Sequence, residues 1–76
     1  MNQQDHSKLM ADFGNRVREI RKGQSMTMEQ MAEKTGLSYR LVSRVELGVV
    51  NPKLCTICAL AEGLGVAYAE MFFPSK

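Results

Sequence analysis

The stretch TMEQMAEKTGLSYRLVSRVELG, residues 27–48, contains two short helical patterns that meet at a glycine. Thr27 followed three residues later by Gln30 matches a capping box, in which each side chain satisfies a free backbone amide at a helix start. Gly36 ends the first pattern, because a residue without a Cβ takes positive φ easily and turns the chain sharply. Ser38 is typical of the N-cap of the helix that follows. The stretch therefore predicts two consecutive helices joined by a tight turn.

Apolar residues on the two patterns are spaced to face each other. Val42 and Val45 lie three apart, on one side of the helix after the turn,. We expect both to pack with Leu37 and Met31 in a shared core. Two helices joined in this way form a helix-turn-helix, with the other side of the second helix facing solvent.

That solvent side carries groups suited to reading DNA. Arg40 and Arg44 are four apart and share a face, and arginine can form two hydrogen bonds with guanine in the major groove,. Tyr39 is placed to contact a base or a phosphate. Three hydroxyl residues near helix starts or on this side are candidates for phosphate or secondary contacts: Thr27, Ser38 and Ser43. On spacing alone, a purely structural helix pair with surface arginines stays open as the alternative.

Three more helices are predicted. A long first helix is expected after Ser7 as N-cap, with its end at residues 23–25 and one apolar stripe formed by Leu9, Phe13, Val17 and Ile20,. A fourth helix begins near Pro52 and ends before Gly65, and its expected buried face is Leu54, Ile57, Ala61 and Leu64. Residues 66–73 form a short fifth helix. The prediction is an all-α domain of five helices over residues 7–73, with a flexible tail at 1–6 and a short tail at 74–76.

Length and charge narrow the function classes. The 76 residues have room for one domain, and the net charge is +2,. Residues 16–53 hold eight basic against four acidic residues, a local excess that suits a polyanion, although solvated surface charge explains it equally,. No apolar run reaches the roughly 18 residues of a membrane span, and no signal peptide is evident, so we expect a cytoplasmic protein that does not enter a membrane.

No enzyme or cofactor site is expected. The serines have no recognisable His and Asp partners, and the chain has no phosphate-binding glycine loop,. Cys55 and Cys58 are spaced CxxC, which is compatible with a redox pair or a metal shared across a dimer. With His6 as the one other Cys or His ligand, a four-ligand zinc site within one chain is excluded by count. We therefore predict two ordinary cysteines on the fourth helix and no metal.

From residue 20 to residue 72 the sequence resembles the Cro and phage-repressor class of helix-turn-helix proteins, the XRE family. The residues that carry the resemblance are Ile20, Arg21, Thr27, 31–38, 42–46, Gly48, Asn51, Pro52, Ile57, Ala61, 64–66, Met71 and Phe72. The resemblance implies a compact, lambda-repressor-like five-helix domain whose second and third helices form the motif. It also implies a dimer on double-stranded DNA, with base-reading positions at Tyr39, Arg40 and Arg44.

The resemblance further implies an ion pair between Arg21 of the first helix and Glu46 of the third. Other positions depart from the family pattern. Met28 stands where the family often has a phosphate-binding glutamine, and Leu47, Val49 and Val50 replace residues that are often polar or basic. We therefore expect fewer contacts with DNA phosphates than is usual for the family. The contacts in doubt are those at the start of the second helix, near Met28, and those in the loop after the third helix.

The fifth helix has more apolar residues than one short helix normally buries. We expect a homodimer interface here, formed by Val66, Tyr68, Met71, Phe72 and Phe73,. The first hypothesis is a dimeric transcription regulator that binds a near-palindromic operator, as Cro-like proteins, restriction-modification controllers or autoregulators do. The alternative is an antitoxin-like or adaptor protein that uses this patch to bind a protein partner. Operator sequence, half-site spacing, the sign of regulation and any effector lie beyond the sequence.

Overall fold

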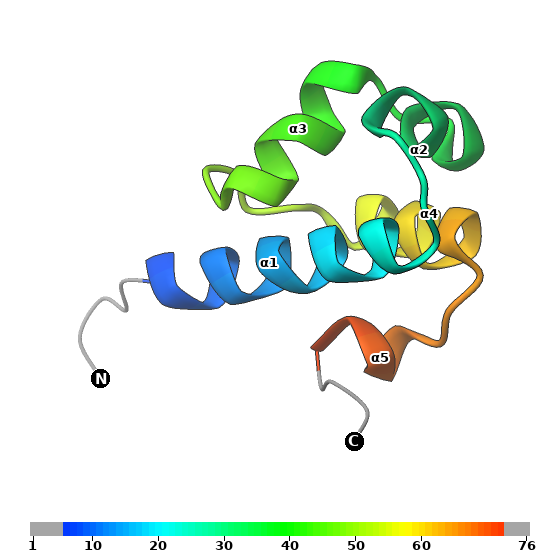
Figure 1. The fold of residues 1–76 in the computed structure, drawn as a ribbon. Helices are drawn as coiled ribbons and strands as arrows, with labels where there is room; N and C mark the ends of the chain where they lie inside the picture. The colour runs from blue at the N-terminus through cyan, green and yellow to red at the C-terminus, as the bar shows by residue number, and fades with distance from the viewer. Residues whose placement is uncertain (1–5, 73–76) are drawn as a thin grey trace.

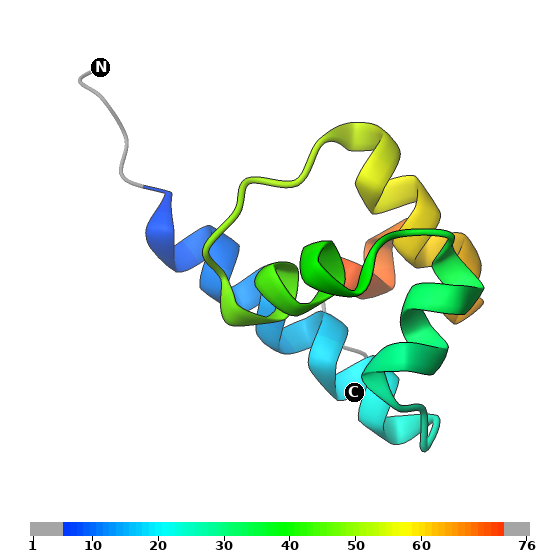
Figure 2. The same ribbon diagram turned by 90° about the horizontal axis from the view of Figure 1, so that it is seen from above.

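The computed structural model describes residues 6–72, which form five helices. In chain order these are α1 (Ser7–Gly23), α2 (Met28–Thr35), α3 (Tyr39–Leu47), α4 (Leu54–Leu64) and α5 (Tyr68–Phe72). Figure 1 shows α2 and α3 above α1 and α5 below it, and in Figure 2, seen from above, α5 lies behind α3. The predicted all-α, five-helix domain is confirmed, with α2 and α3 as the helix-turn-helix.

The local signals at the helix-turn-helix form as predicted. The Thr27 hydroxyl accepts from the Gln30 amide at 3.1 Å, and the Gln30 side chain accepts from the Thr27 amide at 2.8 Å. Gly36 adopts φ 76°, the left-handed conformation that makes the turn, and the Ser38 hydroxyl then accepts from the Leu41 amide at 3.1 Å,. Short-range sequence chemistry therefore accounts for both helix starts and the turn.

The first helix begins one residue earlier than predicted. Ser7 is already helical, and His6 occupies the N-cap position, because its carbonyl accepts the first helical hydrogen bond from Met10 at 3.0 Å. The fifth helix is shorter than predicted at its start. Val66 belongs to the C-cap of α4, where its amide donates to the carbonyl of Ala61 at 3.0 Å,. Phe73, the predicted end, lies outside the described residues.

The core forms where α1 and α4 meet the helix-turn-helix and α5. Its buried apolar residues are Phe13, Val17, Ile20, Met26, Met31, Val42, Val45, Leu60, Ala61, Leu64 and Met71. The predicted shared core of the motif is confirmed, with Leu37 packed at its edge. Two hydrogen bonds from side chains to backbone carbonyls join α1 and its C-cap residue to the C-terminal helices. Arg16 Nε donates to the Glu70 carbonyl of α5 at 2.6 Å, and Gln24 Nε2 donates to the Leu64 carbonyl at the end of α4 at 2.7 Å.

Two residues predicted to be buried are exposed. Leu54 is 75% exposed because it is the first residue of α4, ahead of the turns that pack on the core. Leu9 is also exposed; it lines an open groove with Met10, Phe13 and Ile57 instead of joining the closed core. Both residues follow the apolar periodicity of their helices, which shows that the stripe extends past the part of each helix that is covered.

The closest approach between α1 and α3 occurs at Gly14. A Cβ at this position would overlap the carbonyl oxygen of Val45 and lie 2.8 Å from that of Glu46. Both obstacles are backbone atoms, so a side chain here cannot be accommodated by a rotamer change. A residue without a Cβ is therefore what lets α3 lie against the first helix.

We predict that Gly14→Ala destabilises the protein by about 1 to 3 kcal/mol, because overpacking forces two backbones apart. The matched control is Gly23→Ala, in the same helix, where nothing lies within 4 Å of an added Cβ. This control should leave stability unchanged or raise it, by up to about 1 kcal/mol, since alanine is the better helix former. Urea unfolding of both variants measures the difference. Equal stabilities would contradict the close approach.

Candidate nucleic-acid interface

A buried ion pair fixes the orientation of α3 on α1. Arg21 Nε lies 2.6 Å from Glu46 Oε2, and Arg21 Nη2 donates to Glu46 Oε1 at 3.0 Å. The guanidinium therefore forms two parallel hydrogen bonds with the carboxylate. Arg21 Nη1 also donates to the Met26 carbonyl at 2.9 Å. The two side chains are 12% and 5% exposed. The predicted ion pair therefore forms, and it also holds the loop that leads into α2.

The hydrogen bond that Arg21 donates to Glu46 raises the pKa of the Arg21 guanidinium above its ordinary value, against the opposing effect of burial. The guanidinium therefore stays charged. Each partner needs the other, because a lone charge buried at this position would be left without compensation.

The outward side of α3 carries the three predicted base-reading residues. Val42 and Val45 face the core, whereas Tyr39, Arg40 and Arg44 are exposed. Arg40 and Arg44 lie one turn apart and share a face of the helix,. Leu41, on the same helix, is half-buried and packs against the core. The arrangement leaves two guanidinium groups on one face of an exposed helix.

The three predicted phosphate-contact residues lie at the edges of this helix pair. Thr27 and Ser38 are exposed N-caps whose hydroxyl oxygens accept hydrogen bonds from backbone amides. Each hydroxyl still has its own hydrogen to donate to a phosphate oxygen. Ser43 is half-buried and lines a concavity of about 240 Å³ between α1, α2 and α3. The residues around this concavity are Arg18, Arg21, Met28, Ser43, Glu46 and Leu47.

The loop after α3 offers little to a phosphate. Leu47 is 71% exposed, Val49 is exposed, and Val50 packs partly against the core. None of these side chains carries a hydrogen-bond donor. We expect this loop to make few phosphate contacts, because these side chains cannot donate a hydrogen bond. This stays a prediction.

Some residues of the interface predicted on the fifth helix are buried in the core, and others are exposed. Met71 is fully buried in the chain's own core, so its side chain is unavailable to a partner and this part of the prediction is corrected. Tyr68 and Phe72 are exposed by 53% and 43%, and Val66 is half-buried. The Phe72 ring stacks on Phe13 at a centroid distance of 5.2 Å. Phe73 lies outside the described residues.

The two cysteines lie on the first turns of α4. Cys55 is exposed and Cys58 half-buried, and neither forms a disulfide. A side-chain hydrogen bond and an electrostatic interaction with Cys58 raise the pKa of the Tyr68 hydroxyl above its ordinary value. Within residues 6–72, no group of three or more His, Cys, Asp or Glu side chains is arranged to hold a metal. In the same range, no helix is long and apolar enough to cross a membrane.

Comparisons with known proteins agree on one family. The helix-turn-helix family profile HTH_3 matches residues 17–71. The chain is 31% identical to an uncharacterized HTH-type transcriptional regulator, y4dJ, of Sinorhizobium fredii, covering 82% of this chain and 80% of that protein. It is 35% identical to the HTH-type transcriptional repressor RghR of Bacillus subtilis, covering 84% of this chain but 48% of the repressor.

A solved structure gives the same result for the fold. The restriction-modification controller protein C.AhdI from Aeromonas hydrophila superposes with a TM-score of 0.83 at 34% identity, covering 86% of this chain and 98% of that one. The match extends over all of the controller's fold, so the similarity includes the helices outside the motif.

We predict that Arg21→Met and Glu46→Leu each cost about 3 to 5 kcal/mol of stability, because each leaves one buried charge unpaired. The double variant should come close to the wild type, since it leaves no charge behind. Urea unfolding of the four proteins gives the coupling. Lys8→Met is the control, because Lys8 pairs with Asp12 at an exposed surface and should contribute little,. Additive losses in the double variant would contradict the coupling.

Proposed function

This chain belongs to the helix-turn-helix family of DNA-binding transcription regulators, and we propose that it binds a near-palindromic operator as a homodimer in the cytoplasm. The observation that carries the proposal is the exposed arginine pair on α3, Arg40 and Arg44, held outward by the buried ion pair beneath it. An exposed helix face with two guanidinium groups fits the major groove, where arginine can form two hydrogen bonds with a guanine.

The two arginines define the expected base preference. Each can form two hydrogen bonds with a guanine, so the half-site should contain two specified guanines on the edges that α3 faces. Tyr39, at the N-terminal end of the helix, is placed to contact a neighbouring base or phosphate. In a dimer, the two reading helices would lie about 34 Å apart and contact successive major grooves. The operator would then repeat the half-site with inverted symmetry.

The exposed part of α5 supports a homodimer. Tyr68 and Phe72 are exposed aromatic residues of α5. This helix lies on the side of α1 opposite to α3 (Figure 1). An interface at this side leaves α3 accessible to DNA. Val66 is the third residue of the proposed interface. A regulator of this kind would respond to its own concentration through dimerisation, and the fold likeness to a restriction-modification controller supports autoregulation.

The alternative is an adaptor or antitoxin-like role, in which α5 and the adjoining groove bind a protein. The groove of about 240 Å³ between α1, α4 and α5 favours it, because its lining is mainly apolar and includes Leu9, Phe13, Ile57 and Phe72. This role does not exclude DNA binding, since the groove and the reading helix lie on different elements.

We predict that selection from random DNA returns a near-palindromic site for the wild type. Arg40→Ala and Arg44→Ala should each weaken binding to that site by about 1 to 3 kcal/mol and relax the preference at one position, because each removes a bidentate contact with a base. Lys34→Ala is the control, an exposed basic residue on α2, and should leave the selected sequence unchanged. Unchanged specificity in both arginine variants would refute the assignment of reading residues.

We predict that sedimentation of the wild type over a concentration series shows a monomer–dimer equilibrium. Tyr68→Lys should weaken the dimer about tenfold or more, because it places a charge in an apolar interface. Tyr39→Lys is the matched control, since Tyr39 is 51% exposed, close to the 53% of Tyr68, but lies on α3. A wild type that stays monomeric at all concentrations would contradict the homodimer and favour the alternative, in which α5 binds a protein partner.

A further inference from the structure

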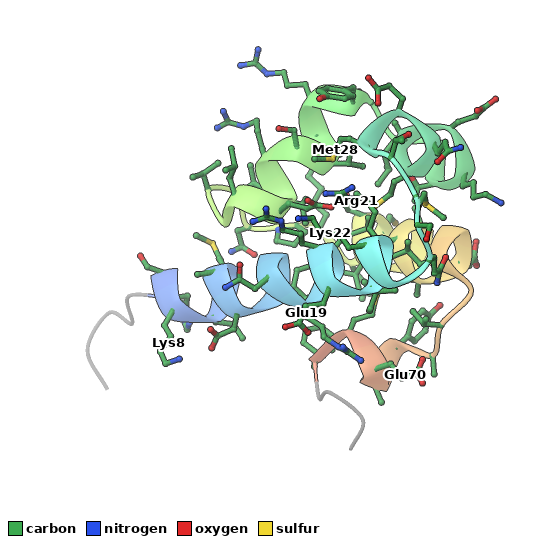
Figure 3. The ribbon with its side chains drawn as sticks, in the orientation of Figure 1. Lys8, Glu19, Arg21, Lys22, Met28 and Glu70 are labelled. Carbon is green, nitrogen blue, oxygen red and sulfur yellow. The ribbon has the colours of Figure 1, made fainter. Side chains whose placement is uncertain are left out.

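The charges on α1 are divided between its two sides. Arg18, Arg21 and Lys22 are spaced three and four apart, so they share one face of the helix,. Figure 3 shows Arg21 and Lys22 on the side of α1 that faces α3, near Met28 of α2. It shows Lys8 and Glu19 on the other side, with Glu19 toward α5. The helix therefore presents a basic face to the same side as the helix-turn-helix.

Most basic residues of α1 are engaged in the fold, but this face keeps two that are not. Lys8 pairs with Asp12, Arg16 with Glu19 and the Glu70 carbonyl, and Arg21 with Glu46. Within residues 6–72, no ion pair or side-chain hydrogen bond engages Arg18 or Lys22. Both residues are exposed. Their charges are thus available to a ligand.

The concavity beside the reading helix brings Arg18 close to α3. Arg18 and Arg21 line it from α1, and Ser43, Glu46 and Leu47 line it from α3. The one carboxylate, Glu46, is neutralised by Arg21 at 2.6 Å. A hydroxyl donor and an uncompensated guanidinium therefore share a hollow of about 240 Å³ on the reading side. This combination suits a singly charged anion with several acceptor oxygens, such as a phosphodiester.

We propose that Arg18, together with Ser43, binds a DNA backbone phosphate in the concavity between α1 and α3, and that Lys22 adds a second contact one turn along α1. The inference rests on the proposed function, because the phosphate is one that flanks the groove occupied by α3. It also accounts for the chemistry of the surrounding positions. The side chains of Met28, Leu47 and Val49 have no donors for a phosphate, so α1 adds phosphate contacts to those expected from Thr27 and Ser38,.

Salt dependence of binding to a random-sequence duplex tests the proposal. Each phosphate contact contributes about 0.9 to the slope of log affinity against log salt concentration. Arg18→Gln should therefore lower the slope by about 0.9 per bound chain, and Arg18→Gln with Lys22→Gln by about twice that. Arg18→Lys should keep most of the slope, because it keeps the charge. The ratio of operator to random-sequence affinity should stay unchanged in all three, since a phosphate contact reads no base.

Lys8→Gln is the matched control, with the same loss of charge on the same helix but on the side away from α3 (Figure 3). It should leave the slope unchanged. A slope in Arg18→Gln equal to that of the wild type, or lowered equally by Lys8→Gln, would overturn the phosphate site while leaving the proposed function intact. A wild type that binds no duplex would overturn both. Unfolding curves confirm that the exposed substitutions leave the fold in place.

Discussion

The bidentate ion pair between Arg21 and Glu46 is the constraint on which the placement of the reading helix depends. Its two bonds join the last turn of α1 to the last turn of α3, and the third bond of Arg21 holds the Met26 carbonyl before α2. A buried ion pair contributes little net stability, because the desolvation of two charges offsets their attraction. Its value here is directional. Apolar contacts would allow α3 to slide or rotate on α1, whereas a fork-to-carboxylate contact permits one register.

The ion pair works together with the close approach at Gly14. This glycine lets the backbones of α1 and α3 touch near Val45 and Glu46, the same part of α3 that the ion pair grips. One contact sets the distance between the two helices, and the other sets the rotation of α3 about its axis. With both fixed, Val42 and Val45 point inward, and Arg40 and Arg44 are necessarily outside. The geometry of the candidate interface thus follows from contacts on its buried side.

Local chemistry was predictable from the sequence, whereas the extent of packing was not. The caps at Thr27 and Ser38 and the turn at Gly36 depend on residues within a few positions of each other, so their patterns identify them directly,. Leu9, Leu54 and Met71 depend on which helices cover which turns. A periodic stripe indicates the side of a helix but not how far along it a neighbour extends.

The candidate site shows the same division. The base-reading residues are a prediction from helix spacing and family resemblance, and the ion pair is a prediction from the resemblance alone. Gly14 has no local signal, because a glycine within a helical pattern only lowers the expected helix stability until its neighbour is known.

The net charge of +2 understates the charge that the reading side presents. Paired charges, as at Lys8 with Asp12 and Arg16 with Glu19, largely cancel each other at a distance. Glu19 lies toward α5 (Figure 3), and Glu46 is neutralised by Arg21. The exposed cations Arg40 and Arg44 of α3, with Arg18 in the concavity beside that helix, therefore have no acidic partner among the ion pairs of residues 6–72. A polyanion approaching α3 meets charges of one sign, whose fields add. The pairing of charges within the fold therefore also determines which side of the surface is positively charged.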